Sequence, residues 1–208
     1  MILDKSYELW KAVYKDDHNG TLQHVSVERL DETSGLAIAA DGWMLAVVPV
    51  ELDEDDVPGL VHWTILAGAR KHQGAAGKRD PWLVLMLDDS TVSYPDGARM
   101  PRTPCVREFP NWRGILEQVS TGEALALQSA LGLNPALLAA LGCALGLPEG
   151  PLLLAPSTPS GPILVETERA DDNGNPTPPY GLLMPMVARE GQTDRARSAL
   201  PKREVARV

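Results

Sequence analysis

The sequence predicts an α+β fold built from two tandem subdomains, and two observations carry that prediction. Helical and strand-like patterns follow one another in the first half of the chain in the order helix, strands, helix, strands. The second half repeats that order more faintly, with segments of helical composition at 64–71 and 136–145 in corresponding places. This repetition predicts a duplicated unit, with subdomains over residues 1–104 and 105–187. Residues 188–208 have the composition of a disordered basic tail.

The first half opens with an expected helix over residues 4–15, where apolar residues recur at helical spacing. Alternation of apolar and polar residues predicts a strand over 22–30. Two more strands are expected over 36–50, joined at Asp41-Gly42, a dipeptide typical of tight hairpin turns. The remaining elements expected in this half are a helix over 61–71, strands over 82–87 and 91–94, and a loop over 95–104.

The second half carries two helix starts that are marked by proline. A short helix is expected over 110–118, because Pro110 is tolerated near a first turn, where its missing amide has no helical partner. Asn134 is expected to cap a helix that runs to Leu145, with Pro135 at the first helical position. The strands expected in this half lie at 124–131, 152–154, 163–168 and 180–187, and residues 171–179 are expected to form a loop.

The charge balance limits the classes of partner. With 28 acidic and 19 basic residues, the chain has a net charge of −9, which argues against a protein whose whole surface coats nucleic acid. The acidic residues concentrate at 51–56, whereas residues 187–208 hold six Lys/Arg against three Asp/Glu. Local contact with nucleic acid therefore stays open. A chain of 208 residues, 44% of them hydrophobic, is long enough for one or two packed cores.

Patterns that the sequence lacks bear on compartment and cofactors. It contains no run of about 18 apolar residues, the length that a membrane-spanning helix requires. Its first residues lack the charged-then-apolar pattern of a signal peptide, so a cytoplasmic protein without membrane contact is expected. Cys105 and Cys143 fit no metal-binding spacing and are expected as reduced thiols. The sequence predicts no metal site and no cofactor.

Three short strings carry most of the functional information. In order along the chain they are Ala39-Ala40-Asp41-Gly42-Trp43-Met44-Leu45-Ala46, Phe109-Pro110-Asn111-Trp112-Arg113-Gly114-Ile115-Leu116 and Tyr180-Gly181-Leu182-Leu183-Met184-Pro185-Met186. By their order and spacing they resemble the bacterial DNA polymerase III β subunit, the replication sliding clamp, where the corresponding strings build one apolar pocket for partner peptides. The resemblance assigns such a pocket in this chain to Ala40, Trp43, Leu45, Pro110, Ile115, Leu182, Met184 and Met186.

The same residues also have a plainer interpretation. Taken singly, Leu45, Ile115 and Leu182 are expected as ordinary core residues. The indole of Trp112 is expected to anchor its short helix by packing. Only the joint occurrence of the strings favours a pocket. Its Leu, Ile and Met walls would suit short linear peptides with Leu and Phe anchors, because methionine lets such a surface repack around several partners.

The resemblance also implies an architecture, the DNA clamp fold. In that fold each subdomain has two helices packed on a curved antiparallel sheet, and six subdomains close a ring around double-stranded DNA. The resemblance covers about residues 3–187, as two subdomains where the bacterial family has three. Two subdomains in a chain, as in proliferating cell nuclear antigen, imply a homotrimer. A phage-like origin would explain why a two-subdomain chain carries strings that resemble the bacterial family. The implied partners are DNA and the peptides of a polymerase and a clamp loader, with no catalytic activity.

Contact with DNA in such a ring would require basic residues on the helices that face the channel. Lys11 and Lys15 are four positions apart, hence on one face of the first expected helix. The other basic residues at the expected helices or just after them are Arg70, Lys71, Lys78, Arg79 and Arg113. The last expected helix, 134–145, carries no basic residue, which leaves the expected DNA contact uneven.

Two other functions compete with a processivity clamp. The first is a clamp-derived interaction module that binds partner peptides without encircling DNA, favoured by the acidic charge and by the helix without basic residues. The second is a small α+β hydrolase or transferase. Catalysis has little support, because the chain lacks a nucleotide-binding glycine loop and a nucleophile elbow. Its four histidines, His18, His24, His62 and His72, are scattered along the sequence.

Overall fold

A computed structural model of the chain describes residues 1–15, 20–73, 80–102, 108–120, 133–147, 152–156, 161–166 and 178–185. All strand pairs among these residues are antiparallel. The fold is therefore α+β with antiparallel sheets, as the sequence predicts. No helix in the described ranges is long and apolar enough to cross a membrane.

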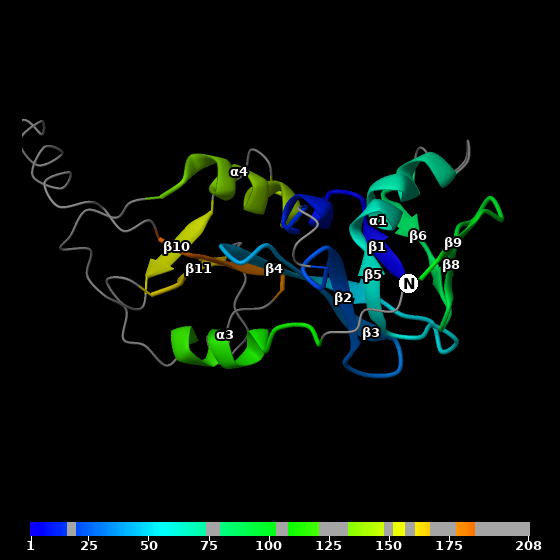
Figure 1. Cartoon of the computed structure of the whole chain (residues 1–208), viewed down its shortest axis with the longest axis horizontal. Coiled ribbons are helices and arrows are strands. Elements are labelled where there is room, and N and C mark those ends of the chain that lie inside the picture. The colour runs from blue at the N-terminus through cyan, green and yellow to red at the C-terminus, as the bar shows by residue number, and fades with distance from the viewer. Residues whose placement is uncertain are drawn as a thin grey trace, which may run out of the picture.

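A nine-stranded sheet organises the described part of the molecule (Figure 1). Its strands are β1 (Ile2–Asp4), β2 (His24–Arg29), β3 (Ser34–Ala40), β4 (Met44–Glu51), β5 (Gly59–His62), β6 (Trp82–Val84), β10 (Leu153–Pro156), β11 (Ile163–Glu166) and β12 (Tyr180–Leu183). They run in the order β10-β11-β12-β4-β3-β2-β5, and β1 pairs with both β4 and β6. A separate three-stranded sheet contains β7 (Met86–Leu87), β8 (Thr91–Ser93) and β9 (Arg99–Pro101).

Strand β4 joins early and late parts of the chain. One edge of β4 pairs with β3 along its whole length. The other edge is shared, because β12 pairs with residues 44–47 and β1 pairs with Glu51. Strands from the C-terminal part of the chain therefore continue the same sheet as strands from the first hundred residues.

The helices lie on two faces of this sheet. The described helical elements are the 3₁₀ helices η1 (Leu9–Lys11) and η2 (Arg70–His72) and the α-helices α1 (Trp63–Ala69), α3 (Trp112–Ser120) and α4 (Pro135–Ala144). Figure 1 shows α1 and α4 on one side of the strands and α3 on the other.

Alternation along β4 creates a separate hydrophobic core on each face. Ala46 and Val48 pack in a core with residues of η1, α1 and α4. Leu45 and Val47 point the other way, into a smaller core that includes Trp112 and Val119 of α3. The chain buries residues on both faces of its central strands because helices cover both.

The prediction of one helix over residues 4–15 is wrong. Ile2 to Asp4 form β1, and the helical part is only the 3₁₀ turn η1. Backbone pairing of β1 with β6 and β4 overrides the helical pattern at the start of the segment. Of the apolar residues that suggested a helix, Leu3, Leu9 and Val13 are nevertheless buried in the core.

Most other expected elements occur close to their predicted positions. The Asp41-Gly42 hairpin, the helices near 110–118 and 134–145 and the strands near 22–30, 163–168 and 180–187 are all present. Besides β1, two strands were missed: β5, which ends within the first residues of a predicted helix, and β9, in a predicted loop. The expected strand at 124–131 and the expected tail at 188–208 lie outside the described residues.

Candidate functional site

An apolar cavity of about 140 Å³ lies between the β3–β4 hairpin, α3 and the end of β12. Seven of the eight residues that the sequence analysis assigns to a pocket line it: Ala40, Trp43, Leu45, Pro110, Ile115, Leu182 and Met184. The eighth, Met186, lies outside the described residues. We call this cavity the apolar pocket.

Strand pairing brings two of the three strings together. Leu45 is opposite Ala40 on one neighbouring strand and opposite Leu182 on the other. Residues directly opposite in antiparallel strands project from the same face, so these three side chains share one face of the sheet. Beyond the end of β12, the amide of Met184 donates to the carbonyl oxygen of Trp43 at 2.8 Å, which attaches this segment to the hairpin.

The hairpin turn that carries Trp43 has its own local cause. The Asp41 carboxylate accepts hydrogen bonds from the amides of Trp43 and Met44, both at 2.8 Å. Gly42 has φ of 92°, in the left-handed region that glycine adopts without strain. This turn places Trp43 outside the packed sheet.

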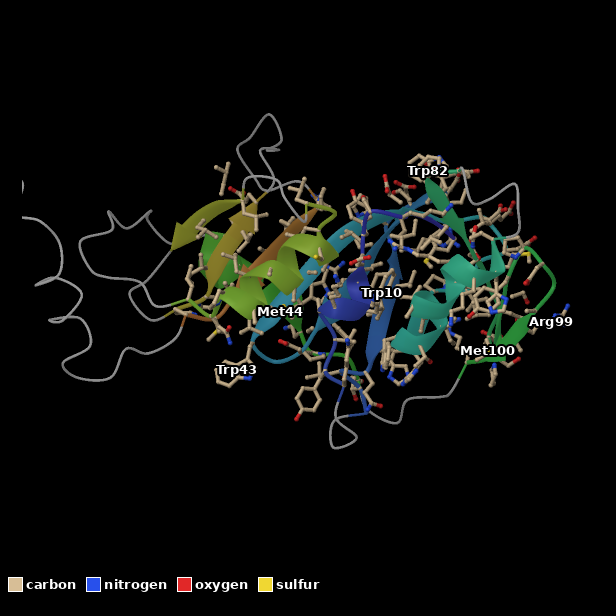
Figure 2. The ribbon with its side chains drawn as sticks, turned by 90° about the horizontal axis from the view of Figure 1, so that it is seen from above. Trp10, Trp43, Met44, Trp82, Arg99 and Met100 are labelled. Atoms are coloured by element: carbon tan, nitrogen blue, oxygen red, sulfur yellow. The ribbon has the colours of Figure 1, made fainter. Side chains whose placement is uncertain are left out.

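The apolar pocket has a buried floor and an exposed rim. Its floor includes Leu45 and Leu182, which are 6% and 4% exposed. Its rim includes Trp43, which is 61% exposed, together with the exposed side chains of Ile115 and Met184. Figure 2 shows Trp43 at the margin of the molecule, pointing away from the ribbon. Three large apolar side chains therefore gather at the mouth of the cavity.

Helix α3 forms one wall of the apolar pocket. Its first residue, Trp112, is buried, and the indole Nε1–H donates to Glu28 Oε1 on β2 at 3.0 Å. The guanidinium of Arg113 lies over the Trp112 ring, 4.3 Å from its centroid, and Arg113 Nη1 is 2.5 Å from Glu28 Oε2. Only a packing role was predicted for Trp112, which both packs in the smaller core and lines the cavity.

Tyr180 lies in the same core as the pocket floor and is buried. Burial raises the pKa of its phenol to about 12, with the nearby Arg113 acting to lower the pKa and Glu28 acting to raise it. The phenol is therefore neutral at physiological pH, and the interior behind the pocket holds no charge at this position.

Four of the basic residues assigned to DNA contact lie on the opposite face of the sheet, among η1, α1 and η2. Lys11 Nζ is 2.7 Å from Glu8 Oε2, and Arg70 Nη1 is 3.2 Å from Glu8 Oε1, so one carboxylate pairs with both. Lys15 Nζ lies 5.3 Å from the centroid of the Trp63 ring. Lys71, on η2, is exposed.

Of the remaining three, only Arg113 is described, and it does not join this group. Arg113 is on α3, across the sheet from the others, and its charge is paired with Glu28. Lys78 and Arg79 fall outside the described residues. The structure therefore gathers Lys11, Lys15, Arg70 and Lys71 on one face and separates Arg113 from them.

Comparison with known proteins identifies the fold. No protein-family model matches the chain, and no curated protein matches it by sequence. Solved structures of bacterial DNA polymerase III β sliding clamps do match. The clamp of Bartonella birtlesii, solved with griselimycin bound, has a TM-score of 0.60 and 12% identity over 90% of this chain and 66% of that one. The chain has the sliding-clamp fold.

Two further clamps support the same fold. That of C. crescentus has a TM-score of 0.58 and 17% identity, and that of Thermotoga maritima a TM-score of 0.58 and 12% identity. In both comparisons the match covers 90% of this chain and 65% of the clamp. The chain thus spans about 65% of the length of these sliding clamps.

The pocket of this sliding-clamp fold also includes residues that the sequence analysis did not assign to it. They are Leu22, Gly42, Met44, Trp112 and Pro162. Three of them lie within the quoted strings, so the strings held the signal. Leu22 and Pro162 lie in segments without any motif, and only tertiary packing brings them to the cavity.

The described residues of this sliding-clamp fold contain no group of three or more His, Cys, Asp or Glu side chains that could hold a metal ion. Cys143 is a free, half-buried thiol, and Cys105 is outside the described residues. His24 and His62 contact each other edge to face, with ring centroids 5.1 Å apart.

Proposed function

We propose that this protein is a sliding-clamp-like processivity factor, a scaffold without catalytic activity of its own. It encircles double-stranded DNA as a homotrimer and tethers a polymerase, a clamp loader or other replication and repair partners by short peptides. The observation that carries this proposal is the apolar pocket, since three strings far apart in the chain supply ten of its twelve lining residues.

The lining of the apolar pocket determines the kind of peptide it would take. Its walls are aliphatic, aromatic and thioether groups, which favour Leu and Phe anchors over charged ones. Each anchor that is fully buried contributes about 1.5–3 kcal/mol.

Fluorescence polarisation with a labelled clamp-binding peptide tests the pocket. Trp43→Ala and Met184→Ala should each weaken binding, because both residues form the exposed rim. Trp82→Ala and Met86→Ala are matched controls, since both residues are exposed but lie away from the pocket, on β6 and β7. Unchanged affinity in both rim variants would contradict the pocket assignment.

The face of the sheet that carries η1, α1 and η2 is the surface proposed to face DNA. Its basic residues include Lys11, Lys15, Arg70 and Lys71. A double variant, Lys15→Ala with Lys71→Ala, should reduce the dependence of duplex affinity on salt concentration, because each lost phosphate contact lowers the slope by about one. Arg99→Ala serves as the control, since Arg99 is exposed on β9, outside this face. An equal effect of the control would show that the charge effect is unspecific.

Ring formation is tested by light scattering at several protein concentrations. A mass of three chains supports a closed ring of six subdomains, with subdomains proposed at 1–104 and 105–187. A monomeric mass at every concentration supports the second candidate function instead.

That second candidate is an interaction module that binds partner peptides without encircling DNA. It is favoured by the net charge of −9 and by α4, Pro135–Ala144, which has no basic residue. The pairing of Glu8 with both Lys11 and Arg70 also offsets part of the positive charge on the face that carries η1, α1 and η2. Peptide binding without duplex binding would identify this function.

A further inference from the structure

Glu28 is joined to two consecutive residues of α3, although it is 84 positions from Trp112 in the chain. One carboxylate oxygen accepts the indole N–H of Trp112 at 3.0 Å, and the other lies 2.5 Å from Arg113 Nη1. The Arg113 guanidinium closes the triangle, because it lies over the Trp112 ring. Both oxygens of a single side chain on β2 are thus used to hold the start of one helix.

Helix α3 needs such contacts to keep a defined position. It has nine residues, which is too short for stability from its own backbone hydrogen bonds. Its packing on the sheet depends on the smaller core, where Trp112 and Val119 are its buried members. Apolar packing is non-directional, whereas the two hydrogen-bonded contacts of Glu28 determine the rotation and depth of the helix.

The position of α3 determines the shape of the apolar pocket. Trp112 and Ile115 of this helix, and Pro110 just before it, line the cavity opposite Leu45 and Leu182. Glu28 itself does not line the cavity. We propose that Glu28 is a positioning residue for the apolar pocket, which acts on a bound peptide through Trp112 and Arg113. Its consequence for peptide binding rests on the proposed function, whereas its effect on α3 does not.

Substitutions can separate the two contacts of Glu28. Glu28→Gln keeps an oxygen acceptor for the Trp112 N–H but loses the charge that pairs with Arg113. Glu28→Ala loses both. Glu32→Gln is the matched control, because Glu32 is an exposed acid in the turn after β2. Arg29 bonds the backbone oxygen of Glu32, so that contact survives the control substitution.

The first measurement is the affinity for a labelled clamp-binding peptide, made well below the melting temperature of every variant. Glu28→Ala should weaken binding about tenfold and Glu28→Gln about threefold, since the contacts are charge-assisted but partly exposed to solvent. Glu32→Gln should bind as wild type. In a Trp112→Phe background, which lacks the indole N–H, Glu28→Ala should cost less than it does alone, because the two residues share one interaction.

The second measurement is amide hydrogen exchange of the free protein. Glu28→Ala should raise exchange in α3 while leaving α1 and α4 protected. A protein that shows this change but binds no peptide, even as wild type, would refute the proposed function and retain the positioning role. Wild-type peptide affinity in Glu28→Ala, or a loss of protection spread evenly over all helices, would overturn the inference.

Discussion

Leu45 on β4 and Leu182 on β12 lie directly opposite each other in an antiparallel pair and project into the same pocket floor. Each is almost fully buried, at 6% and 4% exposed. This one cross-strand pair both joins the last described strand to the centre of the sheet and forms the base of the apolar pocket. The peptide binding proposed above therefore depends on the same contacts as stability.

Leu182→Ala should lower the free energy of unfolding by about 2 kcal/mol or more, through lost burial and an enlarged cavity. Urea denaturation provides the measurement. Leu154→Ala on β10 is the matched control, since Leu154 is 36% exposed and loses less burial. Equal losses in the two variants would show that Leu182 does not hold the buried position described here.

Gly181→Ala should disturb the strand pairing behind the pocket. A Cβ atom at this position would lie 2.6 Å from the carbonyl oxygen of Leu45 and 2.7 Å from Leu141 Cδ1. The carbonyl belongs to the paired backbone and cannot move freely, so we expect a loss of about 1–3 kcal/mol in stability. Weaker peptide binding should accompany it, because Leu182 would move.

Gly20→Ala controls for the loss of glycine itself, since a Cβ there would meet no atom within 4 Å. Urea melts and peptide titrations of the two variants make the comparison. If Gly181→Ala were as stable as Gly20→Ala, β12 would not pack as closely against β4 and α4 as the structure has it.

Tyr180 should make the protein less stable in strong alkali. Its pKa is raised from 10.0 to about 12 in the folded state, so the folded protein retains a proton that the unfolded chain releases. This stability is fully present below about pH 10 and is lost as the pH rises through about 12. Urea melts across that range should show a decline that is smaller in Tyr180→Phe. A decline of the same size in both proteins would contradict the buried phenol.

His62 should make helix α1 sensitive to acid. Its Nδ1 accepts the amide of Thr64 at 3.4 Å and so caps the helix. Burial, followed by the nearby His24, lowers the pKa of His62 below 6.5. The folded state therefore takes up a proton less readily than the unfolded chain, and stability present above pH 6.5 is lost as the pH falls through the lowered pKa.

Hydrogen exchange of α1 at about pH 5 and about pH 7.5 measures this effect. His62→Asn keeps a side-chain acceptor for the cap but does not titrate, so its α1 should be protected at both values. Acid sensitivity that persisted in His62→Asn would place the responsible group elsewhere.

Local chemistry accounts for the parts of the fold that were predicted from sequence. Asp41-Gly42 forms its turn by contacts within four residues, and Asn134 caps α4 through the amide of Ala136 at 3.0 Å. The first segment was mispredicted because its helical pattern reflects burial of residues such as Leu9 and Val13, whereas β1 forms through pairing with strands far along the chain.

The candidate site likewise has a part that the sequence predicts and a part that only the structure shows. Its three strings could be found by resemblance, since each is continuous in sequence. The pocket positions of Leu22 and Pro162 and the role of Glu28 could not be predicted from the sequence. Glu28 has no local partner that marks it. Its contacts with Trp112 and Arg113 exist only once α3 has packed on the sheet.

The sequence by itself determined the α+β class, the turns, the caps and the three apolar strings, because these depend on neighbours within a few residues. Only the tertiary structure decided that β12 pairs with β4, that α3 lies across the sheet from α1 and α4, and that Arg113 lies apart from Lys11, Lys15, Arg70 and Lys71. The physical reason is that side-chain alternation specifies the two faces of a strand from the local sequence alone. Packing between distant segments selects the strand that pairs with each edge and the helix that covers each face.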